Sequence, residues 1–363
     1  MSNKFLSTTS ALLLSTSMLV ADVPKVTVDI APVHSLVSKV MNGVGKPDLI
    51  IPAGASPHEY QLKPSNAQSL EDADIVFWIG EDLTPWLEKG LSSLAQDSSI
   101  TSLLDVDGIE LLSFREGALF EAHDHGDNND HDDHDDHDHG KKKHDDHDDH
   151  DDHDHGKKKH DDHDDHDDHD HGKKKHDDHD DHDDHDHGKK KHDDHDDHEG
   201  HAHGEHDPHA WLSPQIAKVW LNVIAAKLSE VDPDNAAKYF SNAKSARDNI
   251  DLLVSEVSSI LDPMKDKKFV VFHDAYQYFE RDFGISASGA ISLSDASDPS
   301  PSRLAEIRKR VVDEAVECVL AEPQFNQGLV KAVVEGTEAN TTVIDPLGVN
   351  LEAGPSLYEN LIR

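Results

Sequence analysis

Short hydrophobic runs alternate with amphipathic segments over the first hundred residues of the chain. Runs typical of buried strands lie at 25–30, 48–51 and 75–79. Segments with helical periodicity lie at 32–41, 64–71 and 85–94. Strands that alternate with helices predict parallel β-α-β units and a layered sheet.

The same alternation returns in the last hundred residues. It predicts strands at 268–272, 318–321 and 342–344, and helices at 275–283, 302–316 and 327–335. A further helix at 214–228 belongs to the first half of the fold. The chain is therefore expected to form two α/β lobes with parallel sheets, an N-terminal lobe over 22–232 and a C-terminal lobe over 263–363.

One long helical segment separates the two patterns. Pro233–Leu261 contains no internal Gly or Pro, Asp232 precedes it as an N-cap, and Pro263 follows it. A helix of this length is about 43 Å long. We expect residues 233–262 to form a rigid linker that joins the lobes, with a ligand site in the cleft between them.

The middle of the chain has no hydrophobic pattern. A sixteen-residue unit, HDDHDDHDDHDHGKKK, begins at His144, His160 and His176, and partial copies flank these three. The unit has no apolar side chain whose burial would offset the entropy of ordering it. Residues 122–206 are therefore expected to be a disordered His- and Asp-rich insertion within the first lobe.

Net charge narrows the class of ligand. The formal charge is −41, and residues 121–206 hold 36 Asp and Glu against 12 Lys. The rest of the chain is also acidic, at −17. This balance disfavours nucleic acid or an anionic membrane surface as a partner and fits a cation as the ligand.

The N-terminus has the pattern of an export signal. Lys4 is followed by a mostly apolar segment, Ala11–Val20, and cleavage is expected near Ala21. No other run approaches the roughly 18 apolar residues of a membrane helix. Residues 1–21 are thus expected to be a signal peptide, and the mature protein is expected to lie outside the cytoplasm without spanning the membrane.

Four histidines remain outside the insertion: His34, His58, His209 and His273. His34 lies inside an amphipathic helix and is interpreted as structural. His58 follows the strand at 48–51, His273 follows the strand at 268–272, and His209 precedes a helix. Because ligand crevices lie beyond the carboxyl ends of parallel strands, His58 and His273 occupy expected site positions.

Three imidazoles and one further donor form a tetrahedral set that suits Zn²⁺, whereas Mg²⁺ and Ca²⁺ prefer oxygen shells. Asp345 is the candidate fourth ligand because it follows a strand as His273 does. Glu59 and a bound water are the alternatives. Each ligating ring also needs a partner for its second nitrogen, and the sequence does not identify these partners.

Five fragments closely resemble zinc-uptake proteins of the ZnuA type. These belong to the cluster A-I solute-binding family, the metal-binding lipoproteins and periplasmic proteins of bacterial ABC importers. The fragments are Gly54–His58, Asp207–Pro214, Phe272–Tyr276, Ala321–Phe325 and Asp345–Gly348. The resemblance implies zinc ligands at His58, His209 and His273, a related carboxylate at Asp345, and delivery of zinc to a membrane permease without catalysis.

The resemblance also covers the insertion and the single cysteine. It implies that the acidic loop at 122–206 collects additional, weakly bound zinc. Some family members carry a Glu ligand directly before the first His, where this chain has Pro57. Others form a disulfide between a Cys matching Cys318 and one near the C-terminus. Cys318 itself is expected to be a buried apolar residue, and the chain is expected to continue beyond Arg363.

Two other functions fit the same residues. Three histidine ligands and an open coordination position are also typical of a zinc hydrolase. Against this function, the chain has no H-E-x-x-H helix and no separate general base. A zinc buffer or adhesin that works without a permease is the second alternative. Zinc uptake remains the preferred hypothesis.

Overall fold

The computed structural model describes residues 23–115, 120, 206–292 and 299–363. The predicted signal peptide and nearly all of the predicted insertion lie outside these residues. The two sheets described below belong to one compact unit.

The first sheet contains four parallel strands in the order β2-β1-β3-β4. The strands are β1 (Val26–Val28), β2 (Asp48–Leu49), β3 (Ile75–Trp78) and β4 (Ser99–Ser102). Its helices are α1 (Ala31–Val40), α2 (Pro64–Glu71) and α3 (Pro85–Leu94), followed by α4 (Pro214–Val231) after the insertion. The sequence pattern did not predict β4, because this edge strand has only one hydrophobic residue, Ile100.

The second sheet repeats this architecture in the order β6-β5-β7-β8. Its strands are β5 (Phe269–His273), β6 (Ala290–Ser292), β7 (Cys318–Ala321) and β8 (Asn340–Val343). Its helices are α6 (Gln277–Phe283), α7 (Pro301–Asp313) and α8 (Gln327–Val334). The prediction of two parallel α/β lobes is confirmed. In each sheet the first and third strands along the chain are neighbours, and the connections that leave them run toward opposite edges of the sheet. Such topological switch points commonly form ligand sites.

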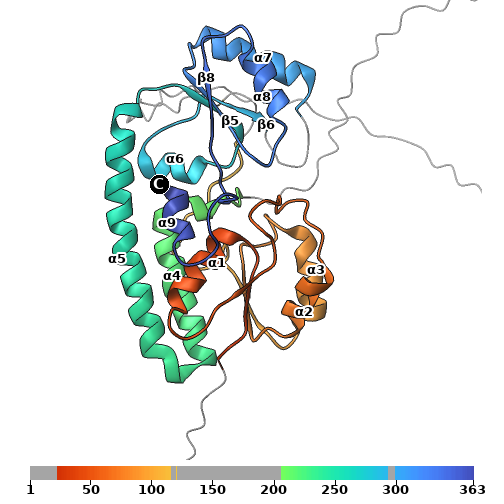
Figure 1. Cartoon of the computed structure of the whole chain (residues 1–363), viewed down its shortest axis with the longest axis vertical. Coiled ribbons are helices and arrows are strands. Elements are labelled where there is room, and N and C mark those ends of the chain that lie inside the picture. The colour runs from red at the N-terminus through yellow and green to blue at the C-terminus, as the bar shows by residue number, and fades with distance from the viewer. Residues whose placement is uncertain (1–22, 116–119, 121–205, 293–298) are drawn as a thin grey trace, which may run out of the picture. The chain divides into compact units, whose positions relative to one another are not determined.

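The predicted long helix is also confirmed, although its first turn is a 3₁₀ helix rather than an α-helix. Asp232 accepts a hydrogen bond from the backbone of Asn235 and begins a short 3₁₀ helix, Pro233–Asn235. The α-helix α5 (Ala236–Leu261) continues for 26 residues, about 39 Å. It packs mainly along α4 and also against α1 (Figure 1).

The hydrophobic core is shared between the sheets. One cluster of buried residues extends from Phe77 in β3 through α4 and α5 to Val271 in β5. A second, smaller cluster covers the opposite face of the second sheet and is packed by α7 and α8. The two sheets are therefore joined by buried side chains as well as by the linker helix.

The last helix, α9 (Leu357–Ile362), packs against α1 and α5 (Figure 1). The backbone N–H of Tyr358 donates a hydrogen bond of 3.0 Å to the Ser35 hydroxyl, and the Tyr358 hydroxyl donates to the carbonyl of Trp211. Lys39 and Glu359 form an ion pair at the same contact. Residues from both ends of the described chain thus stabilise one helix interface.

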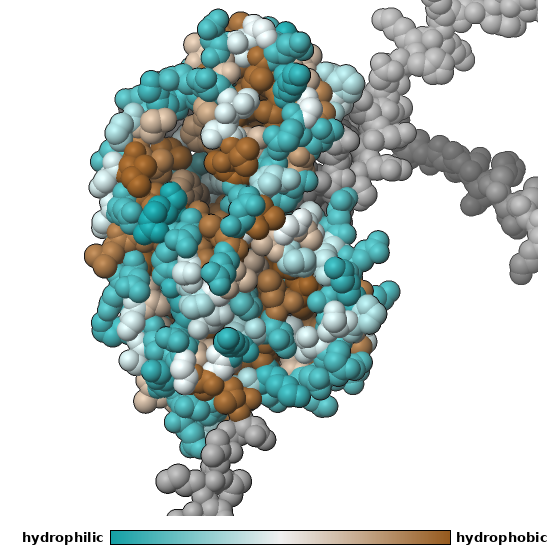
Figure 2. Space-filling model, in the orientation of Figure 1, coloured by the Kyte–Doolittle hydropathy of each residue, from teal (hydrophilic) through white to brown (hydrophobic). Residues whose placement is uncertain are grey.

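Hydrophilic residues cover most of the face shown in Figure 2, with separate hydrophobic patches among them. No helix in the described part of the chain is both long and apolar enough to cross a membrane. Cys318 is half-buried rather than fully buried, which corrects the prediction. Cys318 is the first residue of β7 and lines an apolar cavity of about 400 Å³. Burial raises the pKa of its thiol.

Candidate metal site

His273 and Glu322 lie at the carboxyl end of the second sheet. In the parallel pairing of β5 with β7, Val271 lies opposite Leu320, and continuing this register by two residues places Glu322 beside His273. Glu322 Oε1 lies 2.7 Å from Nδ1 of His273. Both side chains are almost completely buried. Sheet register therefore fixes the orientation of this imidazole.

A second carboxylate holds His209 in the same way. His209 precedes the short 3₁₀ helix Ala210–Leu212 that leads into α4. Asp207 Oδ1 accepts hydrogen bonds from the backbone N–H of His209, at 2.9 Å, and from Nδ1 of its ring, at 2.7 Å. The other oxygen of Asp207 accepts from Gln277 on α6 at 2.9 Å. The C-terminal lobe thus helps to position a ligand candidate from the N-terminal lobe.

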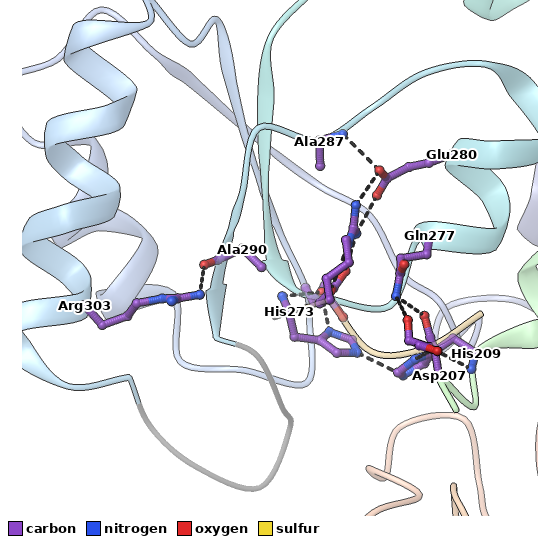
Figure 3. A network of polar contacts seen from close by, with 12 residues as sticks. Asp207, His209, His273, Gln277, Glu280, Ala287, Ala290 and Arg303 are labelled. Atoms are coloured by element: carbon purple, nitrogen blue, oxygen red, sulfur yellow. Dashed lines mark hydrogen bonds and ion pairs between the residues drawn. The ribbon is translucent and has the colours of Figure 1, made fainter. Parts of the chain in front are cut away.

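These contacts determine the tautomer of both rings. A carboxylate accepts the Nδ1 proton of each imidazole, so Nε2 carries the lone pair. The two Nε2 atoms face each other at 3.3 Å (Figure 3). Two nitrogens bound to one tetrahedral zinc at about 2.0–2.1 Å would lie about 3.3–3.4 Å apart. The His209 and His273 pair therefore has the spacing that a zinc ion requires.

His58 provides the third ring of this cluster. It lies in the loop after β2, and Trp86 anchors the loop by donating to the Pro57 carbonyl at 2.8 Å. The ring centroids of His58 and His209 are 5.7 Å apart, against 5.1 Å for His209 and His273. Centroids of two imidazoles on one tetrahedral zinc would be about 5 Å apart. His58 is thus slightly farther out than a bound metal requires.

The three histidines line one small cavity of about 10 Å³. Its other lining residues are Ser56, Pro57, Trp211, Glu322, Gln324, Phe325, Pro346 and Leu347. As they stand, no three His, Cys, Asp or Glu side chains among the described residues form a complete metal-binding group.

Neither of the two candidate carboxylate ligands lines the cavity of the three rings. Asp345 does not line the cavity, and its Oδ1 accepts hydrogen bonds of 3.0 Å from the backbone of Leu347, the backbone of Gly348 and the side chain of Gln324. Glu59 is exposed and also lies outside the cavity lining. The proposal that either one binds the metal remains a prediction.

His34 has the structural role that the sequence indicates. Its Nε2 lies 3.0 Å from the carbonyl of Pro47, and burial lowers the pKa of the ring. It does not line the cavity of the three histidines.

An ion-pair cluster lies directly beside His273. Arg115, from the segment that leads into the insertion, donates to Asp274 at 2.9 and 3.0 Å and to Glu280 at 2.8 and 3.0 Å. Its guanidinium also lies 3.6 Å from the ring centroid of Phe120. Burial raises the pKa of Asp274, and the Arg115 charge opposes this rise. Arg115 thus neutralises carboxylates next to a ligand candidate.

The sequence identified the three rings but missed the residues that orient them. Asp207 and Glu322 both stand in fragments already noted, two residues before His209 and directly after the strand at 318–321. A carboxylate directly after a strand is the available signal for Glu322. Pairing it with His273 requires the register of β5 and β7, which no local pattern provides.

Comparisons with known proteins point to zinc uptake. Residues 26–363 match the family model described as zinc-uptake complex component A, periplasmic. The high-affinity zinc uptake system protein ZnuA of Brucella abortus (strain 2308) is 45% identical over 338 residues, which cover 93% of this chain and 88% of the relative. Its counterpart in Paracoccus denitrificans (strain Pd 1222) is 42% identical over 344 residues, covering 94% and 90%. A crystal structure of ZnuA aligns with a TM-score of 0.63 at 19% identity, covering 94% of this chain and 96% of that one.

Proposed function

Because the chain belongs to the ZnuA family of periplasmic zinc-uptake components, we propose that it captures Zn²⁺ outside the cytoplasm and delivers it to an ABC permease. His58, His209 and His273 hold the ion as cargo. The fourth position takes an oxygen donor, for which Asp345, Glu59 and water are the candidates from the sequence.

The facing Nε2 atoms of His209 and His273 carry this proposal. With both Nδ1 atoms against carboxylates, the two Nε2 atoms face each other across 3.3 Å, a spacing at which one proton can be shared in an N–H···N hydrogen bond. A zinc ion between the two nitrogens would take the place of that proton. Two buried carboxylates, Asp207 and Glu322, also balance the charge of one divalent ion. Nitrogen donors favour zinc over Mg²⁺ or Ca²⁺.

His58 completes the site by a small movement of its loop. The loop between Ile51 and Tyr60 is attached to the first lobe through Trp86, whereas His273 belongs to the second sheet. A metal held by all three rings therefore links both lobes. In this proposal, release to the permease begins with a movement of this loop away from the ion, because the shared core resists separation of the sheets.

The remaining expectations follow from the family. We propose that residues 1–21 direct export to the periplasm, that the mature protein is monomeric, and that the 122–206 insertion binds further zinc weakly. We also propose that the protein is not an enzyme. The carboxylates nearest the rings, Asp207 and Glu322, are occupied in orienting imidazoles, so a zinc hydrolase would lack a general base there.

Zinc binding and zinc uptake are tested separately. Competition with a chromogenic chelator is expected to show one tight Zn²⁺ per chain, and His273→Ala is expected to abolish it. Expression of the wild-type protein with its permease is expected to restore growth in chelated medium to a strain that lacks its own zinc-binding component, whereas His273→Ala is not. Tight binding without rescue would favour a buffer or adhesin, and ester hydrolysis lost in His273→Ala would favour an enzyme.

A further inference from the structure

Gln324 lines the histidine cavity, and one atom of its side-chain amide lacks a partner among the described residues. The amide Nε2 donates to Asp345 Oδ1 at 3.0 Å. The amide Oε1 is buried and accepts no hydrogen bond from any residue that the structure describes. Because Asp345 only accepts hydrogen bonds there, the amide nitrogen must face Asp345, so this assignment of oxygen and nitrogen is fixed by the contact.

A buried carbonyl oxygen without a partner costs about 1–3 kcal/mol, so its retention requires a reason. Three of the neighbouring donors in the cavity are already engaged. Trp211 Nε1 donates to the Pro346 carbonyl at 2.8 Å, and the Nδ1 atoms of His209 and His273 face their carboxylates. The cation that the three rings imply would supply an electropositive partner beside Gln324.

Asp345 accepts several hydrogen bonds within its own loop. Its Oδ1 accepts from the backbone of Leu347 and Gly348 in addition to Gln324, and its other oxygen accepts from the backbone of Val349. These contacts fix the carboxylate within its own loop after β8. A carboxylate fixed in this way keeps the amide of Gln324 in one orientation.

We propose that Gln324 Oε1 is the fourth ligand of the bound zinc and that Asp345 is its positioning residue. This inference rests on the proposed function, because it assigns the remaining donor of the same site. The cavity of about 10 Å³ has room for about one atom of water size. One ion fills it, so the oxygen donor comes from the wall rather than from an additional water.

An amide oxygen has a specific consequence for the cargo. Three imidazoles and one amide form a neutral first shell, whereas a carboxylate would add a negative charge. Manganese prefers carboxylate and water donors, so a neutral, nitrogen-rich shell favours zinc over Mn²⁺. Gln324 thus contributes to metal selectivity as well as to affinity.

The test compares Gln324→Leu, Asp345→Asn and the double variant by chelator competition. Gln324→Leu removes the oxygen at similar volume and is expected to weaken zinc binding by about 10- to 100-fold. Asp345→Asn is expected to weaken it less, and to add little in the Gln324→Leu background. Gln96→Leu, the same substitution at an exposed glutamine, is the control and is expected to bind zinc as the wild type does.

A spectroscopic measurement separates ligation from a structural role. Co²⁺ in the zinc site absorbs visible light with an intensity and position that depend on its ligands, and Gln324→Leu is expected to change this spectrum whereas Gln96→Leu is not. If Gln324→Leu does not fold, Gln324→Met replaces it. Anomalous diffraction from zinc-loaded crystals is expected to place Oε1 at about 2.0–2.2 Å from the ion.

The outcomes are distinguishable. Unchanged zinc affinity and Co²⁺ spectrum in Gln324→Leu overturn the inference, as does a water between Oε1 and the ion. Equal losses from Asp345→Asn in both backgrounds identify Asp345 as an independent ligand and overturn its positioning role. Absence of tight zinc binding in the wild-type protein contradicts the proposed function itself.

Discussion

His273 and Glu322 are cross-strand neighbours whose side chains meet at 2.7 Å, Nδ1 to Oε1. The backbone N–H of His273 also lies 3.3 Å from the same oxygen. Two contacts to one buried carboxylate fix both the position and the tautomer of the ring. The sheet register thereby orients Nε2 of His273 for metal binding in the absence of a metal.

The first prediction follows from this contact. Glu322→Gln replaces an acceptor with an amide that can present either a donor or an acceptor to Nδ1, so the ring is no longer held in one tautomer. Zinc affinity is expected to fall by about 10- to 100-fold, as measured by chelator competition. Glu317→Gln, at an exposed ion pair with Lys267, is the control and should bind normally. Equal affinity in the two variants would show that Glu322 does not tune the site.

Asp207 makes the corresponding contact to His209 and also joins the lobes through Gln277. Asp207→Asn is expected to weaken zinc binding to a similar extent, because it too disturbs an Nδ1 partner. Gln277→Ala leaves the contact of Asp207 Oδ1 to His209 in place, so a smaller loss is expected. Identical zinc titrations for wild type and Asp207→Asn would contradict this assignment.

Arg115 is the cation shared by two buried carboxylates, Asp274 and Glu280. Arg115→Gln removes the cation that is hydrogen-bonded to both carboxylates, which is expected to lower the free energy of unfolding by about 3–5 kcal/mol. Urea denaturation measures this loss. Arg363→Gln breaks the exposed pair with Glu256 and is expected to have a much smaller effect. Comparable losses from the two substitutions would mean that the Arg115 cluster is not a buried ion-pair network.

Asp29 predicts a pH dependence of stability. Burial raises the pKa of its carboxyl from 3.8 to about 7, although the backbone N–H groups of Ile79 and Ile30 donate to it. Between these values the folded state holds a proton that the unfolded state has lost, so stability falls as pH rises. The slope from this one group approaches about 1.4 kcal/mol per pH unit.

Urea unfolding at several pH values from 4 to 8 measures this effect. Asp29→Asn cannot ionise, so its unfolding free energy is expected to depend less steeply on pH than that of the wild type. The comparison concerns slopes and holds even if the substitution lowers stability overall. Parallel pH profiles for the two proteins would exclude Asp29 as the source.

The histidine-rich insertion is expected to be separable from the tight site. Deleting residues 122–206 removes none of the three predicted ligands His58, His209 and His273. Titration calorimetry is expected to show one tight zinc remaining and several weak ones lost. Loss of the tight site in the deletion variant would mean that the insertion supplies a ligand.

Local sequence signals predicted most of the fold. Prolines at the first positions of α2 and α3 gave their boundaries as the structure has them, and the absence of internal Gly and Pro indicated α5. The strands β4 and β6 were missed because Ser99–Ser102 and Ala290–Ser292 are short and lack an apolar run. Their place in the sheets depends on pairing with strands that are buried.

The site was predictable only in part, for a related reason. His58, His209 and His273 differ from the other histidines by their position beside strands or helices, and this is visible in the sequence. Gln324 and Glu322 have hydrogen-bond partners in other strands or loops, and register and packing determine these partners. Asp345 follows a strand as the sequence shows, but the sequence does not show that its carboxylate accepts from backbone amides of its own loop.

The contact between Ser35 and Tyr358 joins residues 323 positions apart. Loop closure over such a distance is entropically costly and slows folding. The interface of α1 with α9 therefore forms only after nearly the whole described chain has been synthesised. Until α9 has been synthesised, the surface of α1 that it covers has no partner from that helix.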